Sequence, residues 1–284
     1  MKRRARTQLL ILVVTSLGAC KAAAPDAVAL TDSGIAAMKR GDSAAALQRF
    51  DAALAIKPDY PRAYRLRGEA RRRKGDYDGA LRDYDQAITL RGGDAGLFND
   101  RAMTHQAKGE HEVAVQDFDR AIALKPDHAL AIKNRGRTQF YLGHFAEAAA
   151  DLRRGASLDT TNAYVAIWLY MAMKRLGHDD MPEFTRQLAR TDSSKWPAPV
   201  ARFYQGRLTA DQLMASAAKT DSKAQEDQRC AVSFYIGEAA LWSKQPDAAS
   251  KRFQETVATC PKSFTEYDAA QAELGRLGKA RNGP

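Results

Sequence analysis

A repeat of 34 residues is the feature that most constrains how this chain folds. Residues of one chemical type recur at that spacing in several separate columns, and a matching alanine column (53, 87, 121 and 156) shows one slip of a single residue. The four regular columns are Gly34, Gly68, Ala102 and Gly136; Gly41, Gly75, Gly109 and Gly143; Ala46, Ala80, Ala114 and Ala148; and Phe50, Tyr84, Phe118 and Leu152. A fixed period of this length predicts an all-α solenoid of stacked units.

Each unit is predicted to be a helix, a tight turn and a second helix. The small residues of the first column let the two helices approach closely, and the large apolar residue of the fourth column fills the space between neighbouring pairs. The glycine of the second column suits the left-handed residue that ends a helix. Pro58 and Pro126 cannot continue the second helix, so they mark the ends of units.

This pattern resembles the tetratricopeptide repeat (TPR) family. The resemblance implies a TPR helical-hairpin solenoid with repeats at 27–60, 61–94, 95–128 and 129–162, and a further repeat with a terminal capping helix within 230–284. The segment 163–229 is an irregular helical linker, in which an apolar helix is expected over 163–176. Capping boxes at Thr209–Gln212 and Ser222–Gln225 predict a helix from 210 to about 218 and another that runs through Trp242.

The first residues have the pattern of a processing signal. Four basic residues precede a short apolar run from Leu9 to Leu17, which is too short to span a bilayer. The run ends in Leu17-Gly18-Ala19-Cys20, which resembles the bacterial lipobox. The resemblance implies a signal peptide over 1–19, acylation of Cys20 (palmitate among the acyl chains) and a tether over 20–26, whereas the alternative is an ordinary secretory signal. Lys21 after the cysteine favours the periplasmic face of the outer membrane over the inner membrane.

Composition and motifs do not point to an enzyme. The chain has 44 basic and 34 acidic residues, but four of the basic ones lie in the signal, which leaves a net charge of +6 for residues 20–284. None of the five histidines is paired at the i, i+4 spacing of a helical metal site, and Gly92-Gly93 lacks the Lys-Ser/Thr of a phosphate loop. We therefore expect no metal, no cofactor and no catalytic residue, and export makes a nucleic-acid partner the weaker interpretation of the run Arg71–Lys74.

The C-terminal third carries a narrower resemblance. Trp196-Pro197, Arg202–Thr209 and Gln212–Met214 look like a passage of the NlpI-like family of outer-membrane lipoproteins, and later blocks match at Phe234–Glu238, Ser263–Tyr267 and Ala272–Leu274. That resemblance implies a non-enzymatic homodimeric adaptor that presents cell-wall (peptidoglycan) hydrolases to a periplasmic protease. A second hypothesis is a TPR lipoprotein that assembles outer-membrane barrel proteins or a pilus secretin.

Two expectations concern the association of helices. Cys230 and Cys260 remain after Cys20 is acylated, and they are expected at adjoining ends of a helical hairpin. In an exported chain we therefore expect a disulfide between them, and the alternative is two buried free thiols.

The helix 163–176 is apolar on more than one face, which supports a homodimer, unless the same chain buries those faces.

The concave face of the array is the predicted binding groove. In the TPR fold, five columns of each first helix line this face, and in this chain cations outnumber acids there. Clustered arginines suggest an extended or helical partner segment that bears carboxylates, and the alternative is a solvated basic face. Glu69, Arg73, Met103 and Gln106 share these columns. The candidate groove residues are Arg62, Arg65, Arg72, Asn99, Lys133, Arg137, Phe140 and Tyr141.

Overall fold

The computed structural model describes residues 26–217, 223–262 and 264–282. Within them the chain forms fifteen α-helices and no strand, so the predicted all-α fold class is confirmed. The signal and Cys20 lie outside the described residues. No helix in the described part of the chain is long and apolar enough to cross a membrane.

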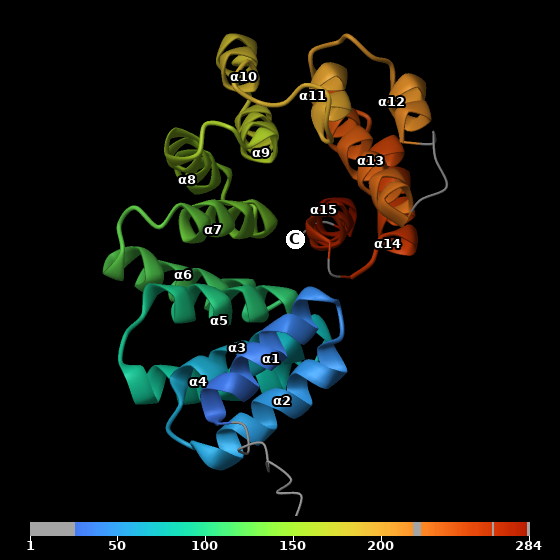
Figure 1. The fold of residues 1–284 in the computed structure, drawn as a ribbon. Coiled ribbons are helices and arrows are strands. Elements are labelled where there is room, and N and C mark those ends of the chain that lie inside the picture. Colours follow the sequence, from blue (N-terminus) through green and yellow to red (C-terminus); the bar gives the residue numbers. More distant parts are fainter. Residues whose placement is uncertain (1–25, 218–222, 263, 283–284) are drawn as a thin grey trace, which may run out of the picture.

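Antiparallel helix pairs make up the first half of the molecule, and the pairs stack side by side (Figure 1). Each pair packs against the next through its second helix. The pairs are α1 (Ala27–Lys39) with α2 (Ser43–Ile56), α3 (Pro61–Arg73) with α4 (Tyr77–Arg91), α5 (Ala95–Ala107) with α6 (His111–Leu124), and α7 (Ala129–Leu142) with α8 (Phe145–Leu158).

The repeated glycines have the roles that the sequence predicts. Gly41, Gly75, Gly109 and Gly143 each adopt a positive φ, between 80° and 84°, at the turn inside a pair. At Gly34 a Cβ atom would lie 2.4 Å from the ring of Phe50, so only glycine permits this approach of α1 and α2. Phe50, Tyr84 and Phe118 are fully buried between neighbouring pairs.

The segment after the fourth pair, predicted as an irregular linker, begins with two helices that continue the stacking of the array. Helix α9 (Ala163–Arg175) packs on α8 as a further first helix, and the short α10 (Met181–Leu188) packs back on α9. Helices α11 (Ala198–Tyr204) and α12 (Ala210–Ser216) follow, and α12 begins with the capping box of Thr209 and Gln212 that the sequence predicts.

The apolar faces of α9 are covered within the chain. Ile167, Trp168 and Met171 are at most 1% exposed and belong to the largest hydrophobic cluster, which also takes residues from α7, α8, α11 and α13. The use of these residues as support for a homodimer was therefore wrong, because the later helices fold back over them.

The C-terminal unit closes the array on itself. Helices α13 (Lys223–Trp242) and α14 (Pro246–Thr259) form a pair, and the longer α15 (Thr265–Asn282) packs on both. Figure 1 shows that α15 also lies beside α7, on the inner side of the curved array. A disulfide joins Cys230, about two turns into α13, to Cys260, the residue that caps the end of α14.

Buried charges fix this closure. Arg175 of α9 forms ion pairs with Glu238 of α13 (3.4 Å) and Glu273 of α15 (2.8 Å), and both carboxylates are fully buried. Arg276 of α15 also pairs with Glu273 and donates to the backbone oxygen of Tyr141 on α7 (2.7 Å). Burial raises the pKa of Glu238. Four helices, α7, α9, α13 and α15, therefore meet through one network.

Candidate functional site

A cavity opens on the concave face where α7, α9 and the start of α15 meet. It has a volume of about 420 Å³. Two cations of the predicted groove, Lys133 and Arg137, lie in its wall, one helical turn apart on α7. Asn134, Tyr164, Trp168, Phe264, Thr265 and Glu266 are among the residues that complete the lining. We call this space the α7 cavity.

The two cations of the α7 cavity differ in how they are held. Lys133 Nζ lies 2.9 Å from a carboxylate oxygen of Asp159, and this hydrogen bond lowers the pKa of Asp159 to about 2. Arg137 Nη2 donates to Asn134 Oδ1 (2.6 Å), whereas Arg137 Nε is buried without a hydrogen-bond partner. Arg137 therefore keeps donor capacity that an added acceptor can use.

Asp268 of α15 lies near enough to Arg137 to interact with its charge. Burial raises the pKa of Asp268 to about 7, although the charge of Arg137 opposes the shift. A carboxyl group that is partly protonated near neutral pH neutralises Arg137 only in part. The lining of the α7 cavity thus combines the cations Lys133 and Arg137 with the carboxylate of Glu266 and with aromatic surface.

Most predicted groove residues of the second and third repeats form ion pairs or hydrogen bonds with other residues of the array. Arg62 pairs with Asp32 (3.1 Å) and Arg65 with Asp100 (2.7 Å). Arg72 is half-buried, with its Nε lacking a partner, and Asn99 is buried and accepts a hydrogen bond from Asn134 (3.3 Å). The structure therefore brings Lys133 and Arg137 together at one cavity and leaves these four residues outside it.

Phe140 and Tyr141 do not lie in an open groove. Phe140 is fully buried and packs edge-on against Phe145 and Trp168, so the prediction that it lines the binding groove was wrong. Tyr141 is 3% exposed, and its hydroxyl donates to the backbone oxygen of Thr265 (3.2 Å). Phe140 therefore packs within the array against α8 and α9, and Tyr141 contacts the start of α15, which the column pattern of the repeats does not reveal.

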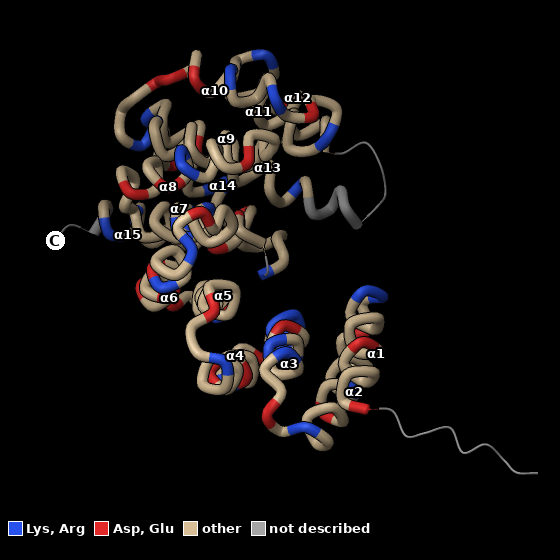
Figure 2. The backbone as a smooth tube through the Cα atoms, turned by 60° about the vertical axis from the view of Figure 1, so that its left-hand side comes forward, with Lys and Arg blue, Asp and Glu red and all other residues tan. Residues whose placement is uncertain are grey.

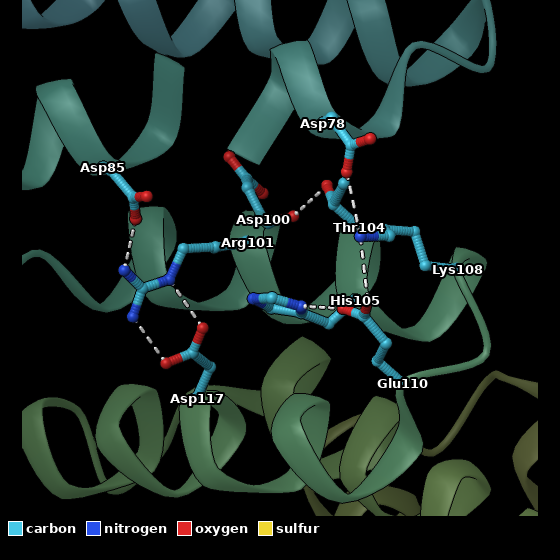
Figure 3. Close-up of polar contacts among 9 residues, drawn as sticks. All are labelled: Asp78, Asp85, Asp100, Arg101, Thr104, His105, Lys108, Glu110 and Asp117. Atoms are coloured by element: carbon cyan, nitrogen blue, oxygen red, sulfur yellow. Dashed lines mark hydrogen bonds and ion pairs between the residues drawn. The ribbon is translucent and has the colours of Figure 1, made fainter. Parts of the chain in front are cut away.

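A second cavity of about 690 Å³ lies along the other side of α15. Lys108, Lys262 and Lys279 line it together with Glu112 and Asp268. Lys108 is already paired with Asp78 (2.9 Å) and Glu110 (2.8 Å), as Figure 3 shows. Part of the positive charge of the second cavity is therefore already neutralised, and its lining also contains the carboxylates Glu112 and Asp268.

An ion-pair ladder that the sequence analysis missed runs between the helix pairs. Arg101 donates two hydrogen bonds of 2.7 Å to Asp117 of its own pair and one of 2.6 Å to Asp85 of the preceding pair (Figure 3). Arg67 and Arg135 do the same with the equivalent aspartates, at the 34-residue spacing. The signal was present in the sequence as one arginine column and two aspartate columns.

The ion-pair ladder also raises the pKa of its three arginines, Arg67, Arg101 and Arg135. The hydrogen bonds that Arg101 donates to Asp117 and Asp85 raise the pKa of Arg101, with Asp117 the larger cause, although burial opposes the shift. The ladder thus joins each helix pair to the preceding pair through charge-assisted hydrogen bonds. Within the described residues no group of three or more His, Cys, Asp or Glu could hold a metal ion.

Comparison with known proteins agrees with this geometry. Residues 31–95 and 99–163 match the tetratricopeptide repeat family model. These segments are tetratricopeptide repeats. The matched segments span the first four helix pairs and the start of α9, which agrees with the 34-residue period of the sequence.

Solved structures with this fold are distant in sequence. A tetratricopeptide repeat protein from Parabacteroides merdae has a TM-score of 0.56 and 18% identity, over 89% of this chain and 99% of that one. The pilF protein of Pseudomonas aeruginosa has a TM-score of 0.51 and 17% identity, over 87% and 97%. MamA has a TM-score of 0.51 and 16% identity, over 64% and 92%. At these identities the likeness concerns the fold alone.

Proposed function

We propose that this TPR protein is a lipid-anchored adaptor on the periplasmic face of the outer membrane, where it gathers cell-wall hydrolases and presents them to a periplasmic protease. The proposal draws on the lipobox that ends at Cys20 and on the NlpI-like order of parts. The observation that carries it is the α7 cavity, because it offers a partner both cations and apolar surface on the concave face.

The chemistry of the α7 cavity favours a segment with a carboxylate beside an apolar or aromatic side chain. Arg137 and Lys133 supply the charge, and a guanidinium can bind a carboxylate through two parallel hydrogen bonds. Tyr164 and Trp168 supply aromatic surface in the same cavity. A cavity of about 420 Å³ accommodates only a few side chains, so the bound part of the partner is short.

Photo-cross-linking in living cells tests this function. A photo-reactive amino acid replaces Leu130, which is 48% exposed and lines the α7 cavity. The matched control replaces Val113, which is 41% exposed and does not line it. We expect adducts with peptidoglycan hydrolases at Leu130 and not at Val113. Adducts with barrel-assembly or secretin subunits at Leu130 would instead favour the second hypothesis of an assembly lipoprotein, and equal labelling at both positions would contradict the site.

We also propose that the adaptor is a homodimer, on the NlpI-like resemblance alone. Light scattering of the soluble chain that lacks Cys20 measures its mass directly. A mass near twice that of one chain supports the dimer, and the mass of a single chain refutes it.

A further inference from the structure

Exposed aliphatic side chains gather on one edge of the TPR array. Antiparallel pairing places the end of each second helix beside the start of the next first helix, and the connections α4–α5 and α6–α7 lie on the same side in Figure 1. Val28 is the second residue of α1, and one aliphatic residue ends or nearly ends each of α2, α4, α6 and α8. We call these residues the aliphatic edge: Val28, Ile56, Leu90, Leu124 and Leu158.

The aliphatic edge is unusual for the surface of this chain. Nine large hydrophobic residues of the described part are clearly exposed, and five of them form this edge, with Ile56 at 57% and Leu124 at 52%. Two more, Leu130 and Tyr164, lie at the same ends of α7 and α9 but line the α7 cavity. Exposed aliphatic side chains that line up along one edge of a fold can serve as an interaction surface.

The tether of the proposed lipid anchor ends on this edge. Asp26 caps α1, so the chain enters the fold directly beside Val28. Only six peptide steps separate Cys20 from Asp26, and even a fully extended chain of that length spans at most about 21 Å. An acylated Cys20 therefore holds the edge within a short distance of the bilayer surface.

The charges along the edge suit a bilayer surface of mixed lipids. Lys57, Arg91 and Lys125 directly follow Ile56, Leu90 and Leu124, and such side chains can lay their stems on apolar surface with the charge at the headgroups. Each cation is followed within two or three residues by a carboxylate, namely Asp59, Asp94 and Asp127, and Asp94 lies 3.6 Å from Arg91. Because the charges nearly balance, the aliphatic side chains supply most of the attachment.

We infer that the aliphatic edge rests on the phospholipid bilayer to which the chain is anchored. This inference rests on the lipid anchor of the proposed function. The contact fixes the orientation of the array, so that the α7 cavity opens close to the membrane surface and beside the edge, where Leu130 and Tyr164 lie. A bound partner is then held near the membrane rather than at the end of a freely rotating tether.

The first test labels the acylated full-length protein in vesicles of phosphatidylethanolamine and phosphatidylglycerol (3:1, a composition of our choosing). Leu90→Cys and Leu124→Cys place an environment-sensitive dye on the edge, and Lys74→Cys places it at the opposite ends of the helices. We expect lipids with a quencher on the acyl chain to reduce the dye emission at least about twofold at both edge positions and not at Lys74→Cys. Equal quenching at all three positions, or protection from an aqueous quencher without lipid quenching, would overturn the inference and indicate a protein contact.

A second test works without the acyl chains, so it separates failure of the edge from failure of the anchor. The unacylated chain that begins at Lys21 is mixed with the same vesicles. We expect Ile56→Ser, Leu90→Ser and Leu124→Ser together to weaken partitioning about tenfold, with little change on added salt. Val113→Ser with Leu176→Ser, which are exposed elsewhere, should leave it unchanged. An equal loss in both variants, or none in the first, contradicts the inference, and the N-terminal mass of the membrane-derived protein reports separately on acylation.

Discussion

The ion-pair ladder makes a quantitative prediction about stability, which the change Arg101→Met tests. Methionine keeps the unbranched stem and removes the guanidinium. The side chain of Asp117 is 4% exposed, and the change takes away both of its 2.7 Å hydrogen bonds. Only Arg120, at 3.4 Å and largely solvated, then remains beside that carboxylate.

The expected loss in the free energy of unfolding depends on whether the carboxylate that loses its partner is buried, as at Asp117, or exposed, as at Asp85. Breaking a buried ion pair by removing one partner costs about 3–5 kcal/mol, and the remaining Arg120 contact places Arg101→Met at about 3 kcal/mol. The other partner, Asp85, has a side chain that is 58% exposed, so Asp85→Asn should cost less than about 1 kcal/mol. The double change Arg101→Met with Asp117→Leu removes both buried charges and should recover part of the loss.

Thermal unfolding followed by circular dichroism measures these differences. For a chain of this size, about 3 kcal/mol corresponds to a fall of roughly 6–12 °C in the midpoint. Because repeat arrays can unfold in parts, amide hydrogen exchange of α5 and α6 accompanies the melt. Equal effects of Arg101→Met and Asp85→Asn, or a loss below about 0.5 kcal/mol in both, would refute the argument that the ladder stabilises the stack.

Three further predictions follow from other parts of the structure. Lys244 has φ 58° at the turn position that glycine holds in the first four pairs, so Lys244→Gly should raise the free energy of unfolding by about 0.5 kcal/mol and Gly109→Ala should lower it by about 1 kcal/mol, both by urea titration. The raised pKa of Asp268, about 7 against an ordinary 3.8, means that its contribution to stability is complete below pH 3.8 and is lost as the pH rises through 7. Asp268→Asn should therefore be more stable than the parent chain at pH 8, by about 1–2 kcal/mol, and an identical pH dependence of the two proteins would exclude this role. Replacing Cys230 and Cys260 by serine opens a loop with a sequence separation of 30 and should cost about 3–4 kcal/mol, whereas two reactive thiols in the unreduced denatured parent would show that the disulfide does not form in the cell.

Local features of the repeats could be predicted from the sequence because each depends on neighbours within one unit. A glycine at 41, 75, 109 or 143 predicts a left-handed turn residue, and the structure has a positive φ at all four. The pairing of Gly34 with Phe50 follows in the same way from the distance between two columns. The ion-pair ladder could also have been predicted, since Arg67, Arg101 and Arg135 recur at the 34-residue spacing, but only the small and apolar columns were used.

The closure of the array could not be predicted in this way, because it joins elements more than a hundred residues apart. Nothing in the repeat pattern shows that α15 turns back onto α7, with Arg276 at the backbone of Tyr141. That contact buries Tyr141, and the packing of α9 buries Phe140. The prediction that both residues line an open groove, made from their columns in the repeat, was therefore wrong. The same closure creates the α7 cavity, of which the sequence identified Lys133 and Arg137 but not the wall from α15.

The most direct test of the proposed function is the affinity of the purified protein for the partner captured at Leu130. Calorimetry compares two variants of the protein. The double variant carries Lys133→Gln and Arg137→Gln, both in the α7 cavity. The control carries Arg62→Gln, which the sequence analysis predicts in the same groove but which lies outside the cavity in the structure. Hydrogen bonds to charged groups contribute about 1.5–3 kcal/mol each, so we expect the double variant to bind at least tenfold more weakly and Arg62→Gln to bind within twofold of the parent. Unchanged affinity in the double variant, or an equal loss in Arg62→Gln, would contradict the assignment of the α7 cavity as the binding site.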